Sequence, residues 1–230
     1  MKDLDAVPVT VIIPAAGMGR RMKSYGPKSL IKIGDSTLIK NQIATLRECL
    51  ETRNIILVCG FRAEKLMDET PDSIIKIENE LYEESNVVRS IAMGLRAIQS
   101  ETTVVIIYGD LVFNQAAIES LDLEKSCVII DAVNMGSSEV GCIIDSKNKL
   151  ANMMYDLPEK WGQIAVFKGR ELDLLKELCW DKKNNRKFGF EIINRIIDKG
   201  GSFDCIRNEE IKVIDIDSSK DIQKAKGILT

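Results

Sequence analysis

The stretch that most constrains this chain runs from Val9 to Lys28, where a run of strand-forming residues gives way to very small ones. Residues 9–13 alternate β-branched and apolar side chains, which predicts a short buried strand. The small residues Ala15, Ala16, Gly17 and Gly19 follow it. Because hardly any side chain stands in the way, a phosphate chain can approach the backbone N–H groups of such a turn closely. The sequence therefore predicts an anion-binding turn at the end of a strand.

Positive charges cluster directly after this turn, at Arg20, Arg21, Lys23 and Lys28. A turn that needed only tight geometry would not require them. The whole chain carries a net charge of −3, so nothing global draws it to nucleic acid or to an anionic membrane. We therefore expect a small phosphorylated partner, with no nucleic acid and no membrane. The alternative is a generic glycine turn followed by solvated Arg and Lys side chains.

Two well-known phosphate loops fit this stretch poorly. A dinucleotide-binding loop needs a third glycine where Met22 stands, and an acidic residue about 20 positions further on, where Ile39 and Lys40 stand. A Walker A loop needs four residues between its glycines, whereas six separate Gly19 from Gly26. The sequence thus disfavours a nicotinamide-dependent oxidoreductase, which we retain only as an alternative.

The pattern that does fit is Ala-Ala-Gly-x-Gly-x-Arg-Met followed by Pro-Lys, from Ala15 to Met22 and then Pro27 and Lys28. It resembles the signature of nucleotidyltransferases of the sugar-phosphate and phosphocholine cytidylyltransferase type, within the MobA-like superfamily. The resemblance implies that Arg21 and Lys28 are the catalytic cations, which neutralise the triphosphate and the acceptor phosphate. It implies a nucleotide-binding set in this stretch made of Ala15, Ala16, Gly17, Met18, Gly19, Arg20, Arg21 and Lys28.

Alternating strands and helices predict an α/β fold: a Rossmann-like three-layer α/β/α arrangement with a mixed, mostly parallel central sheet. Short strands at 127–130 and 141–144 predict a small antiparallel addition in the second half. We expect one domain over residues 1–230, with a nucleotide-binding half, 1–125, and an acceptor-binding half, 126–230. The other expected strands are 9–13, 55–59, 74–77, 104–108 and 211–214. The expected helices are 38–51, 63–67, 85–98, 171–179, 190–199 and 218–228, and the charged stretch 181–187 is expected to be a mobile loop.

Two aspartates stand at predicted strand ends. Asp110 follows the apolar run 104–108 and a glycine, so it lies where open α/β sheets bind ligands. Asp217 lies between the last strand and the last helix, which resembles the closing motif of the family, with Asp215 where that motif usually has Glu. A carboxylate pair suits Mg²⁺, and we expect Asp110 and Asp217 to be its ligands, with Asp110 also nucleotide-binding. Either residue could instead cap the following segment.

Further candidates come from the later helices. Asn86 and Ser90 resemble the Asn and Ser that approach the nucleotide base in the family, although an N-cap explains Asn86 almost as well. Glu191 is a candidate acceptor contact, or a first-turn acid that stabilises the helix dipole. The aromatic residues of the second half are expected mostly in the core, which argues against an aromatic cage for choline. They are Tyr155, Trp161, Phe167, Trp180, Phe188, Phe190 and Phe203.

Composition excludes several function classes. The chain has no histidine, so Ser-His-Asp and Cys-His catalysis and the usual zinc hydrolase sites are excluded. Its six cysteines form no C-x-x-C pair and are expected to be small buried residues in a reducing cytoplasm. No apolar run is long enough to cross a membrane, and the N-terminus does not look like a signal peptide. The sequence leaves a homo-oligomer open.

These observations together predict a Mg²⁺-dependent nucleotidyltransferase that releases pyrophosphate. CTP is the favoured donor on resemblance, and the acceptor is a small phosphate or phosphonate: phosphocholine, an aminoalkyl phosphonate or another phosphorylated small molecule. Two alternatives stay open, a sugar-1-phosphate nucleotidyltransferase using UTP or another triphosphate, and a non-catalytic nucleotide sensor on the same fold.

Overall fold

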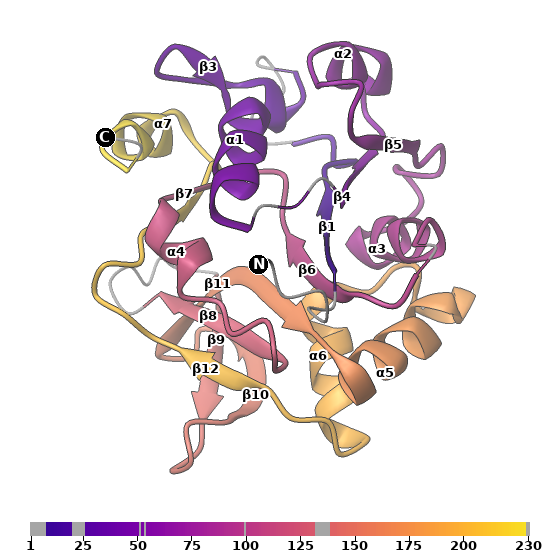
Figure 1. Ribbon diagram of the computed structural model, residues 1–230, viewed down its shortest axis with the longest axis vertical. Coiled ribbons are helices and arrows are strands. Elements are labelled where there is room, and N and C mark those ends of the chain that lie inside the picture. Colours follow the sequence, from indigo (N-terminus) through magenta and orange to yellow (C-terminus); the bar gives the residue numbers. More distant parts are fainter. Residues whose placement is uncertain are drawn as a thin grey trace, which may run out of the picture.

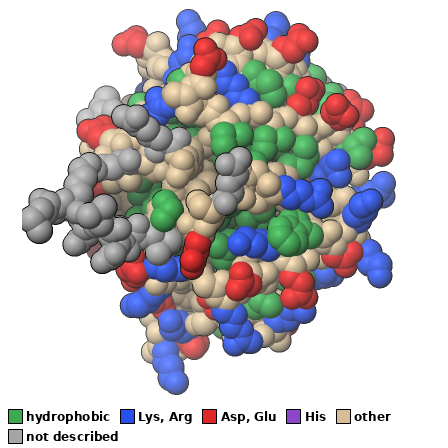
Figure 2. Space-filling view, turned by 45° about the vertical axis from the view of Figure 1, so that its right-hand side comes forward, with side chains coloured by type: hydrophobic (Ala, Val, Ile, Leu, Met, Phe, Trp, Pro, Cys, Tyr) green, Lys and Arg blue, Asp and Glu red, His purple; other side chains and the backbone are tan. Residues whose placement is uncertain are grey.

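A computed structural model describes residues 8–19, 26–50, 52, 54–98, 100–131 and 139–228 of the chain. A central sheet is covered by helices on both faces, as Figure 1 shows, which confirms the predicted three-layer α/β/α fold. Figure 2 shows acidic and basic side chains interspersed over the face in view, which agrees with the small net charge.

The strands are β1 (Val9–Pro14), β2 (Lys32–Ile33), β3 (Ser36–Thr37), β4 (Asn54–Cys59), β5 (Ile75–Glu78), β6 (Thr103–Ile107), β7 (Leu111–Phe113), β8 (Cys127–Asp131), β9 (Val140–Ile144), β10 (Leu150–Tyr155), β11 (Glu159–Phe167), β12 (Asp204–Ile206) and β13 (Val213–Asp215). The α-helices are α1 (Leu38–Leu50), α2 (Ala63–Asp68), α3 (Val87–Arg96), α4 (Gln115–Glu119), α5 (Gly169–Trp180), α6 (Gly189–Asp198) and α7 (Ser219–Lys226). Short 3₁₀ turns span Lys28–Leu30 and Lys182–Asn184. Every strand and helix predicted from the sequence is present within a few residues of its expected bounds, whereas β2, β3, β7, β10, β11, β12 and α4 were not predicted.

The main sheet has nine strands within the described residues. It runs β10-β9-β11-β6-β1-β4-β5, with β8 and β12 attached through β11. Strand β1 pairs in parallel with β4 and β6, and β4 pairs in parallel with β5. Strand β11 then pairs antiparallel with β6, so the second half of the chain extends the sheet of the first half. This is the mixed sheet with an antiparallel addition that the sequence predicts.

Two hydrophobic cores lie on opposite faces of the sheet. In β1, Ile12 points into the core beneath α3, α5 and α6, while Val11 and Ile13 point into the core beneath α1, α2 and α4. The alternation follows from the two-residue period of a strand. Burial of both faces explains why the central strands are apolar throughout rather than alternating with polar residues.

The cysteines and the apolar segments bear on two further predictions. All six cysteines are free, and five of them are buried, as expected of small apolar residues. Among the described residues, no helix combines the length and the apolar character needed to cross a membrane.

Candidate functional site

A pocket of about 1280 Å³ opens at the carboxyl ends of the parallel strands. Open α/β sheets bind ligands at this edge. Nine of the residues predicted for the site line the pocket: Ala15, Ala16, Gly17, Gly19, Lys28, Asn86, Ser90, Asp110 and Asp217. Residues far apart in the sequence thus meet in one cavity.

The small-residue turn after β1 presents backbone N–H groups to the pocket. The N–H of Ala15 is already used, since it donates to the Val58 carbonyl at 2.8 Å. The N–H groups of residues 16–19 make no hydrogen bond within the described part of the chain. Gly19 has a φ of +53°, and a Cβ there would lie 3.0 Å from the Lys28 side chain. This turn therefore offers donors to an anion, and its last glycine lets Lys28 pass close by.

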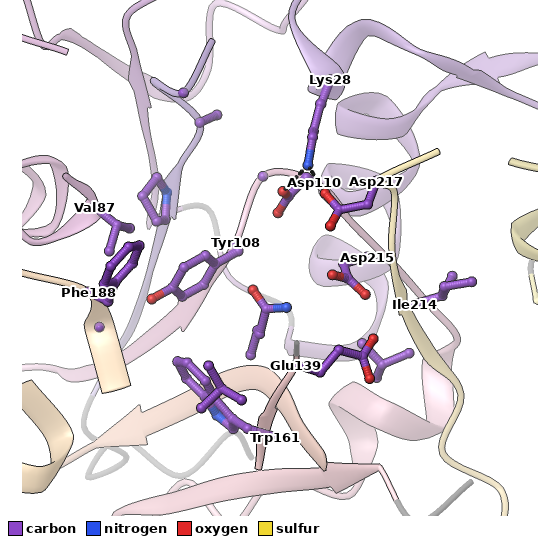
Figure 3. Close-up of a pocket in the computed structure, with 18 of the residues that line it drawn as sticks. Lys28, Val87, Tyr108, Asp110, Glu139, Trp161, Phe188, Ile214, Asp215 and Asp217 are labelled. Atoms are coloured by element: carbon purple, nitrogen blue, oxygen red, sulfur yellow. Dashed lines mark hydrogen bonds and ion pairs between the residues drawn. The ribbon is translucent and has the colours of Figure 1, made fainter. Parts of the chain in front are cut away.

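Lys28 joins the two predicted metal ligands. Its Nζ lies 3.0 Å from Asp110 Oδ2 and 2.6 Å from Asp217 Oδ1, as the dashed lines in Figure 3 mark. The Lys28 side chain is 15% exposed, whereas those of Asp110 and Asp217 are 30% and 37% exposed. Burial alone would lower the pKa of Lys28, but the two carboxylates outweigh it and raise the pKa above its usual value. One cationic group is therefore held between two carboxylates that can be reached from the pocket.

A two-stranded sheet brings these two carboxylates together. Strand β13 pairs antiparallel with β7, with Asp215 opposite Leu111, and the Ile216 N–H donates to the Asp110 carbonyl at 3.0 Å. Asp217 therefore emerges beside Asp110 although 106 residues separate the two in sequence. Strand β7 begins at Leu111, directly after Asp110, so its pairing with β13 brings Asp217 next to Asp110.

The capping alternatives for both aspartates can now be assessed. The helix after Asp110 is α4, and its N-cap is Asn114, whose side chain accepts from the Ala117 N–H. The N-cap of α7 is Ser218, and Asp221 accepts from its N–H at 2.7 Å. Neither Asp110 nor Asp217 is an N-cap residue, so helix capping does not explain their presence.

The turn that carries Asp110 is held from beneath by α1. Gln42 is 3% exposed, and its Nε2 donates to the Tyr108 carbonyl at 2.9 Å and to the Leu111 carbonyl at 2.8 Å. The hydroxyl of Ser29 donates to the Gly109 carbonyl at 2.6 Å. Three carbonyl groups around Asp110 are thus satisfied by side chains from other elements, which fixes the position of the turn.

We expect Gln42→Leu to lower the free energy of unfolding by about 2 kcal/mol, because it removes the two hydrogen bonds that a buried side-chain amide donates to the Tyr108 and Leu111 carbonyls. Urea denaturation measures the loss. Asn41→Leu is the matched control, since Asn41 is the next residue and donates a single, longer bond of 3.2 Å to the Ile33 carbonyl. Equal losses in the two variants would contradict the role assigned to Gln42.

One end of the pocket is built by α3 and the segment before it. Asn86 is the N-cap of α3, and its side chain accepts from the Val87 N–H at 2.8 Å. Ser90 is buried and accepts from Asn79 Nδ2 at 3.2 Å, while Asn79 Oδ1 accepts from Arg89 Nε at 2.9 Å. Asn79 is 1% exposed and lines the pocket, although the sequence did not single it out. Its side-chain amide is thus fixed on both sides.

The opposite end carries a second lysine between two carboxylates. Lys160 Nζ lies 2.7 Å from Glu139 Oε1 and 3.3 Å from Asp215 Oδ1. Burial alone would lower the pKa of Lys160, but Asp215 and Glu139 raise it overall. In Figure 3, Glu139 and Asp215 lie on one side of this end, across from Tyr108 and Trp161.

Aromatic side chains also line the pocket. Tyr155 packs edge-on against Phe190, with ring centroids 5.5 Å apart, and Phe190 stacks on Phe188 at 5.9 Å. Tyr155 and Phe188 are 42% and 45% exposed. The expectation that the aromatic residues are mostly core holds for Phe167, Phe203 and Trp161, which are buried. It is wrong for Tyr155 and Phe188, because β10 is an edge strand and Phe188 precedes α6 at the pocket, and it is wrong for Trp180, which is exposed at the end of α5.

Four predicted residues do not contribute to the lining in the described structure. Arg20 and Arg21 lie outside the described residues. Met18 is described but does not line the pocket. Glu191 does not line it either: its carboxylate accepts from the Phe188 N–H at 2.8 Å and pairs with Lys187. Although burial alone would raise its pKa, these partners lower the pKa of Glu191. The structure therefore favours the helix-stabilising alternative for this residue.

A known protein family matches most of this chain. The model of the MobA-like NTP transferase domain matches residues 11–188. The chain belongs to the MobA-like NTP transferase family. This match covers most of β1, the phosphate turn and Asp110, but ends before Asp215 and Asp217.

Other proteins resemble this NTP transferase domain over much of its length. The bifunctional protein GlmU of Neisseria meningitidis serogroup B is 24% identical over 170 residues, which are 74% of this chain and 34% of GlmU. GlmU of Solibacter usitatus is 33% identical over 105 residues, 45% of this chain and 22% of the relative. The domain thus spans about a third or less of these relatives.

Two solved structures share the fold. A CTP:phosphocholine cytidylyltransferase from Streptococcus pneumoniae superposes with a TM-score of 0.75 at 17% identity, covering 97% of this domain and 100% of that chain. An inositol-1-phosphate CTP transferase from T. maritima superposes with a TM-score of 0.77 at 18% identity, covering 98% of each chain. At these identities the likeness shows the fold of the NTP transferase domain alone.

Proposed function

We propose that the chain is a Mg²⁺-dependent cytidylyltransferase that transfers CMP from CTP to a small phosphorylated or phosphonate acceptor and releases pyrophosphate. The observation that carries this proposal is the contact of Lys28 with both Asp110 and Asp217 at the phosphate-binding turn. In this reaction an acceptor oxygen forms a bond to the α-phosphorus, and the bond from that phosphorus to the oxygen bridging to the β-phosphate breaks. Such transfers depend on positioning and charge neutralisation more than on a protein nucleophile.

The chain's own residues would supply that neutralisation. The N–H groups of residues 16–19 would hold the β- and γ-phosphates, and Lys28 would offset charge on the α-phosphate and the leaving pyrophosphate. Arg21 would assist Lys28, a role that rests on the sequence motif. Asp110 and Asp217 would hold Mg²⁺, which neutralises charge at the reacting phosphate oxygens. The fit is supported by the cation that these two carboxylates already hold, the Lys28 ammonium, and by the preference of Mg²⁺ for carboxylates with phosphate oxygens.

The two ends of the pocket would divide the substrates. Asn79, Asn86 and Ser90 would surround the base, and the fixed amide of Asn79 would hold Ser90 in place there. The exposed rings of Tyr155 and Phe188 and the carboxylates of Glu139 and Asp215 suit an acceptor with a positive charge, because aromatic rings and carboxylates both attract cations. We therefore favour phosphocholine or an aminoalkyl phosphonate as the acceptor. The phosphocholine named for the Streptococcus pneumoniae neighbour supports this choice.

A sugar 1-phosphate is the second candidate acceptor. A structure named for a glucose-1-phosphate thymidylyltransferase from Bacillus anthracis shares the fold, with a TM-score of 0.80 at 14% identity. Such an acceptor would need hydroxyl contacts rather than rings, and the polar groups of Lys160, Glu139 and Asp215 could provide them.

A matrix of four nucleoside triphosphates against phosphocholine, an aminoalkyl phosphonate and several sugar 1-phosphates, with Mg²⁺, tests these assignments through pyrophosphate release. We expect the highest kcat/KM with CTP and a cationic acceptor. Turnover only with UTP and a sugar 1-phosphate would establish the second candidate. Tight nucleotide binding without pyrophosphate release from any pair would instead indicate a non-catalytic sensor.

We expect Phe188→Ala to raise KM for the cationic acceptor about 3- to 30-fold, the loss expected for one cation–π contact, with KM for CTP unchanged. Initial rates at varied acceptor concentration measure the change. Trp180→Ala is the control, because Trp180 is equally exposed, at 47%, but does not line the pocket. A similar KM in wild type and Phe188→Ala would remove the aromatic row from the acceptor site.

A further inference from the structure

The order of the strands determines which parts of the pocket lie next to one another. Strands β5 and β4 lie beside the end that contains Asn79, β1 leads into the phosphate turn, and β6 leads to Asp110. The next strand past β6 is β11, on the side away from the phosphate turn. A residue of β11 that faces the pocket beside the end of β6 is therefore next to the reacting centre, on its acceptor side.

Gln163 occupies that position with an unusual backbone. It precedes Ile164, which pairs with Ile107, so it lies alongside the carboxyl end of β6. Its φ is +56°, in the left-handed region, and the register between β11 and β8 shifts between Trp161 and Ala165. At bulges of this kind glycine adopts the conformation without steric cost, whereas a residue with a side chain is strained.

The side chain of Gln163 is free to bind a ligand. It is half-buried, lines the pocket, and makes no hydrogen bond to any residue that the structure describes. The nearby Lys160 side chain, by contrast, already has partners in Glu139 and Asp215. A glutamine amide offers two N–H donors and a carbonyl acceptor.

We propose that Gln163 is a specificity-determining residue that donates a hydrogen bond from its amide to a phosphoryl oxygen of the acceptor. The assignment rests on the proposed function. It explains why a strained position beside the reacting centre carries a long amide side chain, where glycine would fit the backbone better. The amide would orient the phosphoryl group whose oxygen attacks the α-phosphorus.

Gln163→Gly tests this role by removing the amide and the strain together. We expect KM for the acceptor to rise about 10-fold, the usual effect of one hydrogen bond to a charged group, with KM for CTP unchanged and Tm equal or higher. Asp156→Gly is the control, since Asp156 has a similar φ of +61° in the turn after β10 but does not line the pocket. An acceptor KM within twofold of wild type would overturn the role of Gln163, whereas a wild-type protein that releases no pyrophosphate would overturn the proposed function itself.

A separate observation concerns the order in which ligands enter. If Asp110 and Asp217 are metal ligands, as the proposed function requires, the Lys28 ammonium stands where the metal would bind, at 3.0 and 2.6 Å from their oxygens. Two cations cannot share that position, because like charges a few ångströms apart repel strongly at low dielectric. The phosphates of a bound nucleotide would give Lys28 another partner, at the turn that its side chain already touches.

We infer that Lys28 closes the carboxylate pair to divalent cations until a nucleoside triphosphate draws the ammonium away. The metal then binds with or after the nucleotide. The coupling is reciprocal, so nucleotide and metal strengthen the binding of each other.

Binding of Mn²⁺ to the nucleotide-free protein, followed by electron paramagnetic resonance, tests this inference without any turnover. We expect Lys28→Met to bind Mn²⁺ at least about 10-fold more tightly than wild type, and Lys28→Met with Asp110→Asn to lose that gain. Lys224→Met is the control, because Lys224 lines the pocket but makes no salt bridge within the described residues. Equal Mn²⁺ affinity in wild type and Lys28→Met would overturn the inference, and Lys28→Gln serves if the methionine variant does not fold.

Discussion

Replacing Lys28 with alanine is expected to lower kcat for pyrophosphate release by about 10²- to 10³-fold, the loss typical of one preorganised charge-stabilising donor. The reason is its place in the pocket: the ammonium lies beside the phosphate turn and is oriented by Asp110 and Asp217. Because the ammonium acts on charge that develops during the transfer, kcat falls more than the affinity for the nucleotide. Steady-state rates with saturating CTP and acceptor measure this effect.

Lys224→Ala provides the comparison for Lys28→Ala. Lys224 also lines the pocket, so its loss removes the same charge without touching the two carboxylates. We expect its kcat to remain within a few-fold of wild type. A Lys28→Ala variant that keeps near wild-type pyrophosphate release, while folded by its Tm, would contradict the catalytic role.

Asp217→Asn is expected to lower kcat by a similar factor, about 10²- to 10³-fold, since a catalytic metal contributes several kcal/mol of charge stabilisation. Asparagine keeps the shape of the side chain but removes the charge that holds a divalent cation. The Mg²⁺ concentration for half-maximal rate should rise as well. A titration of rate against Mg²⁺ measures both changes.

The control for this variant is Asp72→Asn, which removes one negative charge on the surface, where Asp72 pairs with Lys76. It should leave the Mg²⁺ dependence unchanged. If Asp217→Asn also left the Mg²⁺ dependence unchanged, Asp217 would not be a metal ligand.

Much of the fold was accessible from the sequence because the central strands are buried on both faces. Their apolar runs, as in 55–59 and 104–108, stand out against the amphipathic helices between them. The phosphate turn and Asp110 follow such runs directly, so their place at the carboxyl edge of the sheet could be predicted. Strands β7 and β11 gave no such signal, because β11 contains Lys160 and Gln163 and β7 has only three residues.

The site was harder to predict where residues act through tertiary contacts. Gln42 lies in the middle of a helix, and only the structure reveals that it holds the turn before Asp110. Asn79 follows a strand with no motif around it, and its hydrogen bonds to Ser90 and Arg89 could not be inferred from the sequence. For Asp217, the sequence left capping open, and the pairing of β13 with β7 explains why it reaches Asp110 instead.

The charged stretch 181–187 is a further case in which local composition misled. It was expected to be a mobile loop, yet Asn184 is 2% exposed and is bonded to the Leu178 carbonyl and to Arg195. The Asn185 carbonyl accepts from the Asn86 N–H at 2.7 Å, which ties the second half of the chain to the start of α3. A buried asparagine satisfied on several sides orders a segment whose neighbours are mostly charged.

The central claim is that Asp110 and Asp217 act together at one cation. The most direct measurement is kcat for Asp110→Asn, Asp217→Asn and the double variant, with CTP, acceptor and Mg²⁺. Groups that act as a unit are strongly non-additive, so we predict that the double variant is within about 3-fold of the slower single variant. A double variant whose loss equals the product of the two single losses would contradict the claim.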